Sequence, residues 1–211
     1  MSVVGRIAFY QNRRDEVPNQ ELAHELAASK DKSGIHEIAS NLTNKNNSIR
    51  SDCLKVLYEV GYKEPELIAP YAKDFLALLD EKNNRMVWGA MIALATIADL
   101  NTEPIWSGID KVISAIDNGS LITLVWGIRT VARTAAKSTT RIRSIMPKLL
   151  QYLKTCNARD VPTHLESMLP IINKANWGEL AKTVESRRTE MTVSQLGRLK
   201  RVLKRIPWIR N

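Results

Sequence analysis

Residues that commonly carry chemistry are sparse in this chain of 211 residues. Its three histidines, His24, His36 and His164, form no H-E-x-x-H motif and lie at no spacing that would hold zinc together with a cysteine. The nine glycines are scattered singly, so they cannot form a loop that cradles a phosphate, and no G-x-S-x-G motif is present. We therefore predict no catalytic residue, no metal site and no cofactor.

Basic side chains give the strongest functional pattern. Residues 1–117 contain 13 basic and 17 acidic side chains, a balance of −4, whereas residues 118–211 contain 18 basic and 5 acidic ones, a balance of +13. No carboxylate side chain occurs between Asn118 and Arg159. Such an asymmetry is typical of a chain that binds an anionic partner. The alternative is a solvated basic surface that only keeps the protein soluble.

The candidate anion-binding residues lie in the basic half. Arg129 and Arg133 are four residues apart and off the apolar stripe, which places both on one side of a helix. Each cation that neutralises a phosphate releases counterions, so the affinity for nucleic acid would fall steeply with salt. The full predicted set is Arg129, Arg133, Lys137, Arg141, Arg143, Lys148, Arg198, Lys200, Arg201, Lys204 and Arg205.

An internal repeat of 37 residues must position these side chains. At intervals of 37 residues the sequence has Leu54, Met91, Ile128 and Leu165, so this position is apolar in each unit. Within each unit, apolar residues recur at i, i+3, i+4 and i+7, the spacing of one face of an α-helix. Units of this length bury their apolar faces only by stacking on one another. The sequence therefore predicts an all-α fold, a right-handed α-solenoid of about five helix pairs plus a C-terminal capping helix.

Turn residues set the expected boundaries of a single repeat domain over residues 1–211. We expect an N-terminal arm at 1–18, repeats at 19–46, 47–83, 84–120, 121–157 and 158–191, and a basic capping helix and tail at 192–211. The helices expected in the three central repeats are Ile49–Gly61 and Pro65–Leu79, Asn84–Ala98 and Pro104–Ile116, and Leu121–Ala135 and Arg141–Leu153.

Two segments resemble the HEAT repeat, whose first helix reads roughly V-R-x-x-A-x-x-A-L after a turn that contains an aspartate. They are IRSDCLKVL at Ile49–Leu57 and MVWGAMIAL at Met86–Leu94, with Asp80 and Asp117 in the turns. About three units carry the resemblance. It implies an α-solenoid of the HEAT/armadillo-like class that scaffolds other macromolecules.

Two HEAT-like enzyme families offer alternatives. The deoxyhypusine hydroxylases bind iron through His-Glu pairs in several symmetry-related repeats, whereas His24-Glu25 and His36-Glu37 both lie in one unit here. We interpret them as surface pairs. The alkylpurine DNA glycosylases hold a damaged base against Trp, Arg and Asp in a basic cleft. Trp106 with Asp110 is the nearest counterpart, but that family's Trp-Trp-Asp segment is missing.

Our preferred interpretation is a non-enzymatic protein that engages an acidic macromolecule, with nucleic acid favoured, through its basic C-terminal half. A protein–protein scaffold is the first alternative and a glycosylase the second. The last helix, Thr192–Ile206, is expected to cap the stack, although a basic amphipathic helix also suits a membrane surface or a partner's groove. Because Cys53 and Cys156 form no C-x-x-C pair and no long apolar run is present, we expect a soluble, cytoplasmic protein.

Overall fold

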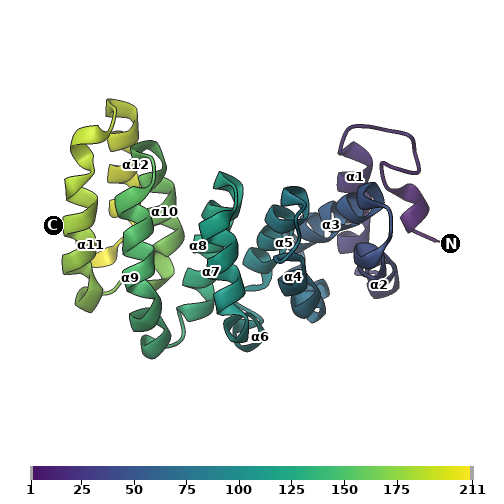
Figure 1. The fold of residues 1–211 in the computed structure, drawn as a ribbon, viewed down its shortest axis with the longest axis horizontal. Helices are drawn as coiled ribbons and strands as arrows, with labels where there is room; N and C mark the ends of the chain where they lie inside the picture. Colours follow the sequence, from purple (N-terminus) through teal and green to yellow (C-terminus); the bar gives the residue numbers. More distant parts are fainter. Residues whose placement is uncertain (1, 210–211) are drawn as a thin grey trace. The chain divides into compact units, whose positions relative to one another are not determined.

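A computed structural model describes residues 2–209, and within that range all of the regular secondary structure is helical, without strands (Figure 1). The prediction of an all-α fold is confirmed. Within the predicted repeat domain, the chain forms two compact units, residues 1–130 and 131–211, and their boundary falls inside one helix, α8 (Leu121–Ala135).

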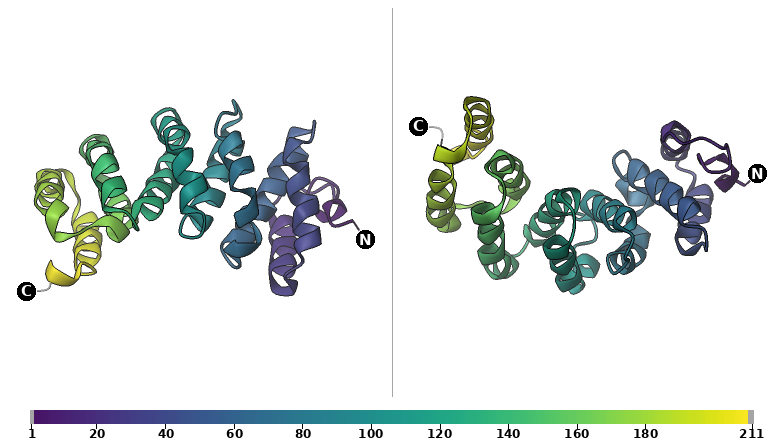
Figure 2. Two further views of the ribbon diagram at one scale, coloured as in Figure 1. Left: turned by 90° about the horizontal axis from the view of Figure 1, so that it is seen from below. Right: turned by 45° about the horizontal axis from the view of Figure 1, so that its top comes forward.

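In the first unit, α3 packs between α1 and α5 (Figures 1 and 2), so one helix from each of three repeats forms a continuous row. The short helix α4 packs against α5 and α6. The elements of this unit before α8 are η1 (Val4–Arg6), α1 (Val17–Ser29), α2 (Lys32–Ser40), η2 (Asn41–Thr43), α3 (Asn47–Gly61), η3 (Pro65–Leu67), η4 (Ala69–Tyr71), α4 (Ala72–Leu78), α5 (Asn84–Ile97), α6 (Thr102–Ser107) and α7 (Ile109–Asn118).

In the second unit, α9 packs against α11, and α10 packs against both α9 and α12. This is the alternation expected of stacked helix pairs. After α8 its elements are α9 (Thr139–Thr155), η5 (Ala158–Asp160), α10 (Val161–Met168), η6 (Leu169–Ile171), α11 (Lys174–Ser186), η7 (Arg188–Glu190), α12 (Val193–Leu203) and η8 (Pro207–Ile209).

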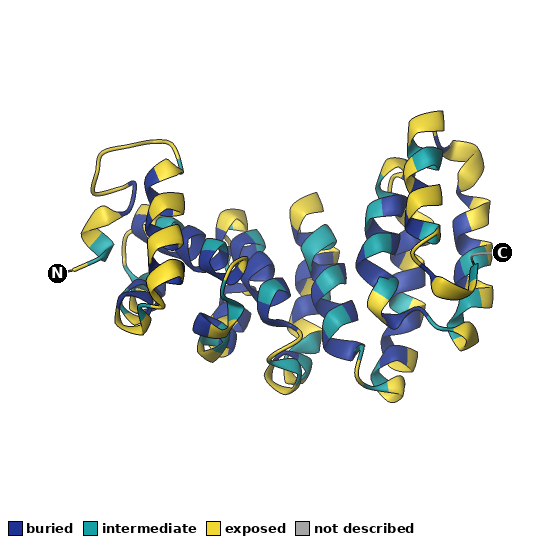
Figure 3. Cartoon of the chain, turned by 180° about the vertical axis from the view of Figure 1, so that it is seen from behind, coloured by how far each residue is buried: buried dark blue, intermediate teal, exposed yellow. Residues whose placement is uncertain are grey.

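The apolar residues of the 37-residue repeat form the core. Leu54, Met91, Ile128 and Leu165 are all buried, and the exposed residues gather on the outer faces and turns (Figure 3). The helices of neighbouring repeats come very close in places. A Cβ atom added to Gly89 of α5 would lie 2.7 Å from Cδ2 of Leu54 on α3, so the Leu54 side chain would have to shift to admit any larger residue.

Polar caps recur with the same period. Asn46, Asn83, Ser120 and Asn157 follow one another at intervals of 37 residues. Each side-chain oxygen accepts a hydrogen bond from a backbone N–H two or three residues further on, over distances of 2.9–3.3 Å. Since the first N–H groups of a helix have no partner within the helix, these caps set where each repeat's first helical segment begins.

Two second helices differ from our expectation. The helix predicted over Pro65–Leu79 is split into η3, η4 and α4. Pro70 lies in the middle of this segment and has no N–H to continue an α-helical ladder. The helix predicted over Pro104–Ile116 is interrupted at Gly108, between α6 and α7. Glycine weakens a helix because it loses more backbone entropy on folding than other residues.

Arg187 binds the backbone carbonyl groups at the C-terminal end of α9. Its guanidinium donates hydrogen bonds to the carbonyl oxygens of Leu153 (2.7 Å), Lys154 (2.7 Å) and Cys156 (2.8 Å), and it also pairs with Glu190 at 2.7 Å. Arg187 is buried, and its charge lies at the negative end of the α9 dipole. Although Arg187 belongs to the basic half of the sequence, its contacts show that it stabilises the fold.

Candidate binding surfaces

An aromatic row crosses the first unit on α3, α5 and α8. Tyr58 lies with its ring centroid 6.2 Å from Trp88 and 6.0 Å from Tyr62, and Tyr62 lies 5.8 Å from Trp126. The rings are tilted or edge-on to one another, the arrangements that aromatic pairs prefer. Tyr62 leaves 47% of its surface exposed, while Trp88 and Trp126 are half-buried. These four residues are called the aromatic row below.

Cations of the chain itself already lie on this row. The Arg129 guanidinium is 4.5 Å from the ring of Trp126, and Lys55 Nζ is 4.9 Å from the ring of Tyr58. Both distances are within the range of cation–π attraction, which the negative face of an aromatic ring provides. Tyr58 and Lys55 are both buried, so the accessible part of the row, at Tyr62, Trp88 and Trp126, is the surface on which a further positive group would be favourable.

Carboxylates border the row at Lys55. Lys55 Nζ is 2.8 Å from Glu16 and 2.7 Å from Glu59, and Arg85 contacts the other oxygen of Glu16 at 3.0 Å. Although the burial of Lys55 opposes its charged form, the hydrogen bonds to Glu16 and Glu59 raise its pKa above the ordinary value. Burial raises the pKa of Tyr62 to about 12, so its hydroxyl stays protonated at neutral pH.

The basic residues proposed from sequence are distributed over several helices. On α8, Arg129 belongs to the first unit and Arg133 to the second, and both are half-buried. On α9, Arg141 and Lys148 are seven residues apart and share a face, whereas Arg143 is exposed about 200° further round the helix. Lys148 Nζ lies 5.2 Å from the ring of Tyr152. Lys137, which follows α8, is exposed.

The five cations of α12 and its C-terminal end lie on different sides. Arg198 and Arg205 both pair with Glu166 of α10, Arg198 at 3.5 Å. Lys200 and Lys204 line an apolar groove instead. Arg201, the remaining cation of the predicted set, is exposed. The structure therefore brings two pairs together and does not join all five into one cluster.

Residues relevant to the enzyme alternatives lie on different helices. Trp106 lies in α6 and Asp110 in α7, on either side of the break at Gly108. Glu25 pairs with Arg6, and Glu37 accepts hydrogen bonds from the backbone N–H groups of residues 3 and 4 at 3.0 and 3.1 Å. Both glutamates hold the N-terminal segment, in agreement with our interpretation as surface pairs. Among residues 2–209, no three His, Cys, Asp or Glu side chains are grouped so that they could hold a metal.

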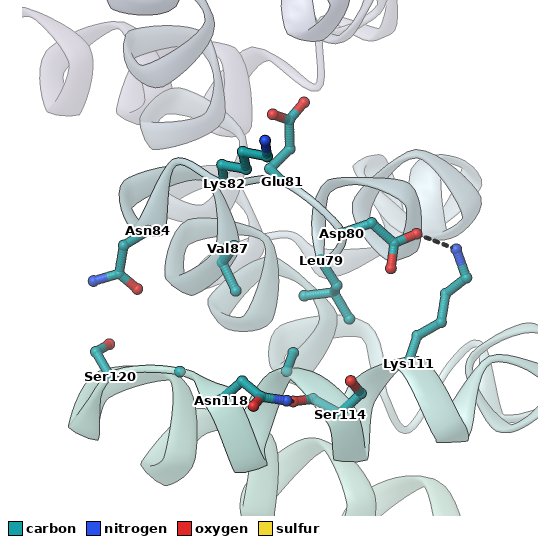
Figure 4. Close-up of a pocket in the computed structure, with 12 residues that line it drawn as sticks. Leu79, Asp80, Glu81, Lys82, Asn84, Val87, Lys111, Ser114, Asn118 and Ser120 are labelled. Atoms are coloured by element: carbon teal, nitrogen blue, oxygen red, sulfur yellow. Dashed lines mark hydrogen bonds and ion pairs between the residues drawn. The ribbon is translucent and has the colours of Figure 1, made fainter.

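A polar cleft of about 570 Å³ lies between consecutive repeats of the first unit (Figure 4). Asp80 and Lys111 face each other across it and form an ion pair. A second cleft, of about 350 Å³, contains Asp74, the residue 37 positions before Lys111. Because a carboxylate in one cleft corresponds to an ammonium in the other, the two do not select a common ligand. We interpret them as consequences of stacking.

Sequence reasoning missed the aromatic row. The four tryptophan and tyrosine positions fall outside the strict repeat, because Trp88 and Trp126 are 38 residues apart instead of 37. Tyr58 and Tyr62 do stand at i, i+4 on one helix, a signal that is visible in the sequence. That their rings meet those of α5 and α8 depends on how the three helices pack, which the sequence does not specify.

Comparison with known proteins places the fold. No protein-family model matches the sequence, and no curated protein matches it significantly. Solved structures do match. An engineered protein aligns with a TM-score of 0.64 at 17% identity over 99% of this chain and 98% of its own. A designed armadillo repeat protein in complex with the peptide (KR)4 aligns with a TM-score of 0.65 at 12% identity, over 89% of this chain and 86% of its own.

A third similar structure is a computationally designed armadillo repeat protein for modular peptide recognition, with a TM-score of 0.62 at 12% identity over 96% of this chain and 97% of its own. Together these matches establish that the chain has the fold of a HEAT/armadillo-like α-solenoid, as its sequence predicts. None of the helices in the described range is long and apolar enough to cross a membrane.

Proposed function

We propose that this protein is a non-enzymatic repeat scaffold that binds a protein partner, and that the aromatic row is the surface that takes a basic peptide segment. The main observation in support of this proposal is the aromatic row. Its rings are packed against one another and so are ordered before binding, and Tyr62 still presents almost half of its surface. Rigid tyrosine and tryptophan side chains are enriched among the residues that dominate the energy of protein interfaces.

Charge favours a cationic occupant. Residues 1–130 contain 14 basic and 17 acidic side chains, a balance of −3. Glu16 and Glu59 border the row, and Arg129 on Trp126 shows within the chain the contact that a partner's arginine would make on Tyr62. The similar designed armadillo protein in complex with (KR)4 supports the same class of ligand.

The test uses fluorescent (KR)4, with a matched Asp-Glu repeat as the control peptide, and measures binding by anisotropy. We expect (KR)4 to bind more tightly than its acidic counterpart. Tyr62→Ala should weaken binding about two- to thirtyfold, the range of one cation–π contact. Tyr10→Ala, at a tyrosine outside the row that is 52% exposed, is the matched control. Equal loss from Tyr10→Ala, or equal binding of the two peptides, would overturn the proposal.

A second candidate function is the binding of nucleic acid through backbone phosphates. Residues 131–211 contain 17 basic and 5 acidic side chains, a balance of +12, and this charge supports an anionic polymer as ligand. The contacts would come from the basic set predicted above, without base reading. A cytoplasmic location agrees with the two free cysteines, Cys53 and Cys156.

This candidate predicts binding to a generic DNA duplex in low salt, with an affinity that falls steeply as salt is added. Changing Lys137, Arg143, Lys200 and Arg201 to Glu, four exposed positions, should abolish it. A duplex that fails to bind in low salt, or that binds the fourfold variant equally well, removes nucleic acid from consideration while leaving the peptide proposal intact.

A further inference from the structure

The apolar side of helix α12 is only partly covered. Along one edge it packs toward α10 and buries Leu199 and Val202. The other edge, called the outer face below, carries Val193, Leu196 and Leu203, of which Val193 is 88% exposed and the two leucines are half-buried. Positions 193, 196 and 203 lie on one side of a helix of 3.6 residues per turn. We expected α12 to cap the stack, and the outer face shows that part of its own apolar side stays uncovered.

A groove of about 950 Å³ runs along this outer face, and Leu199, Arg188 of η7 and Ile209 of η8 also line it. We call it the α12 groove. Its size and its stripe of apolar residues at helical spacing suit a peptide helix, because helices bind such grooves through anchors at i, i+3, i+4 and i+7. Lys200 and Lys204 lie within the same lining, one turn apart.

The charge around the groove selects among occupants. Residues 191–211 include six basic residues and no acidic one. A basic or neutral helix would gain only apolar contacts there, whereas carboxylates flanking an apolar stripe would also meet Lys200 and Lys204. Nucleic acid would use the lysines but would leave the apolar stripe uncovered. The combination of an apolar floor and a cationic rim therefore favours an amphipathic acidic helix.

We propose that the α12 groove docks an amphipathic helix of an acidic protein partner, with the partner's apolar residues on Val193, Leu196 and Leu203 and its carboxylates at Lys200 and Lys204. This surface is separate from the aromatic row, and the two ligands have opposite charge. The scaffold would thus hold a basic segment on its first unit and an acidic helix on its second.

Three synthetic helical peptides of about 15 residues test the proposal, measured by fluorescence anisotropy. The first has leucines at i, i+3, i+4 and i+7 with glutamates elsewhere, the second replaces the glutamates by lysines, and the third scrambles the first so that its leucines no longer share a face. We expect the first to bind and the other two to bind at least about tenfold more weakly. Equal binding of the scrambled peptide, which has the same charge, would overturn the proposal.

Variants separate the two parts of the groove. Leu196→Asp should weaken the acidic peptide about tenfold or more, the loss expected when one apolar anchor is removed. Ser194→Asp adds the same charge to an exposed position of the same helix outside the lining and is the matched control. Replacing Lys200 and Lys204 by Glu keeps the apolar floor and should reverse the preference toward the lysine peptide.

An acidic peptide that binds Leu196→Asp as well as wild type, with the circular dichroism of the two proteins equal, would show that the groove is not its site. A DNA duplex that competes with the acidic peptide and is equally weakened by Leu196→Asp would also contradict the proposal. Neither result would affect binding of (KR)4 to the first unit, so the failure of one proposal is distinguishable from the failure of the other.

Discussion

Asn46 and Asn83 stand one repeat apart and occupy the same structural position, since each accepts a hydrogen bond from the backbone N–H two residues later, at 2.9 and 3.0 Å. We expect Asn83→Ala to lower the free energy of unfolding by about 1 kcal/mol, the usual loss for an N-cap. Asn83→Asp should be nearly neutral, because aspartate caps equally well. Urea denaturation measures both, and the exposed neighbour Asn84→Ala is the control, for which a change of similar size would contradict the prediction.

Arg187 allows a stronger prediction. Its replacement by Ala removes the donors that satisfy the carbonyl groups at the end of α9. We expect a loss of about 3 kcal/mol or more, the magnitude for breaking a buried charged contact. Arg187→Lys should recover only part of it, since lysine lacks the planar fork. Arg188→Ala, at an exposed pair with Glu185, should change stability by less than about 1 kcal/mol, and an equally large effect there would refute a special role for Arg187.

His164 predicts a pH dependence of stability. It is buried, and neither ring nitrogen has a hydrogen-bond partner within residues 2–209. Burial lowers its pKa, while the nearby charge of Asp160 opposes that shift. In an unfolded chain a histidine has a pKa of about 6.5, so below that pH the unfolded state takes up a proton that the folded state does not. Stability should therefore be full above pH 6.5 and decrease as the pH falls toward the lowered pKa.

Urea midpoints measured between about pH 5 and 8 check this dependence. His164→Leu should flatten the profile and raise stability at acidic pH, because it also removes two unpaired buried nitrogens. His24→Leu, at an exposed histidine of α1, is the matched control. A profile that both substitutions flatten equally would rule out His164 as the cause.

We predict that Lys55 stabilises the fold through its ion pairs with Glu16 and Glu59. Its side chain is buried between Glu16 and Glu59, so Lys55→Met leaves both carboxylates without their shared cation. We expect a loss of about 1–3 kcal/mol, discounted from the fully buried case because Glu16 is substantially exposed. Lys63→Met, at an exposed lysine just beyond the same helix, is the control. Equal midpoints for the two variants in urea denaturation would argue against this role of Lys55.

The repeat in the sequence predicts most of the fold, because burial follows apolar periodicity directly. Leu54, Met91, Ile128 and Leu165 were expected in the core and all are buried. What the period does not contain is local backbone chemistry. The interruptions at Pro70 and Gly108 divide helices that the apolar pattern alone would continue. The fold class and its core were therefore accessible, and the subdivision of the second helices was not.

The candidate surfaces were harder to predict, since the aromatic row joins side chains of three helices and the α12 groove depends on which part of α12 its neighbour leaves open. The charge count identified the basic half but not that Arg198 and Arg205 are engaged with Glu166, or that Arg187 serves the fold. The apolar residues of α12 form one continuous side, and the sequence does not show how much of it a neighbouring helix covers. The outer face of α12 could therefore be recognised only once α10 was seen to cover the other edge.

The close approach at Gly89 sets more than packing. Gly89 adjoins Trp88, and its missing side chain leaves room for the Leu54 side chain of α3, so the spacing of the Tyr58 and Trp88 rings depends on this contact as well as on the rings themselves. A methyl group there would force the buried Leu54 side chain or α5 itself to move, and any movement of α5 would change the spacing of the rings, although no residue that touches a ligand had changed. Substitutions at a glycine that sets the spacing between helices, without touching a ligand, are a route by which related solenoids can acquire new binding specificities.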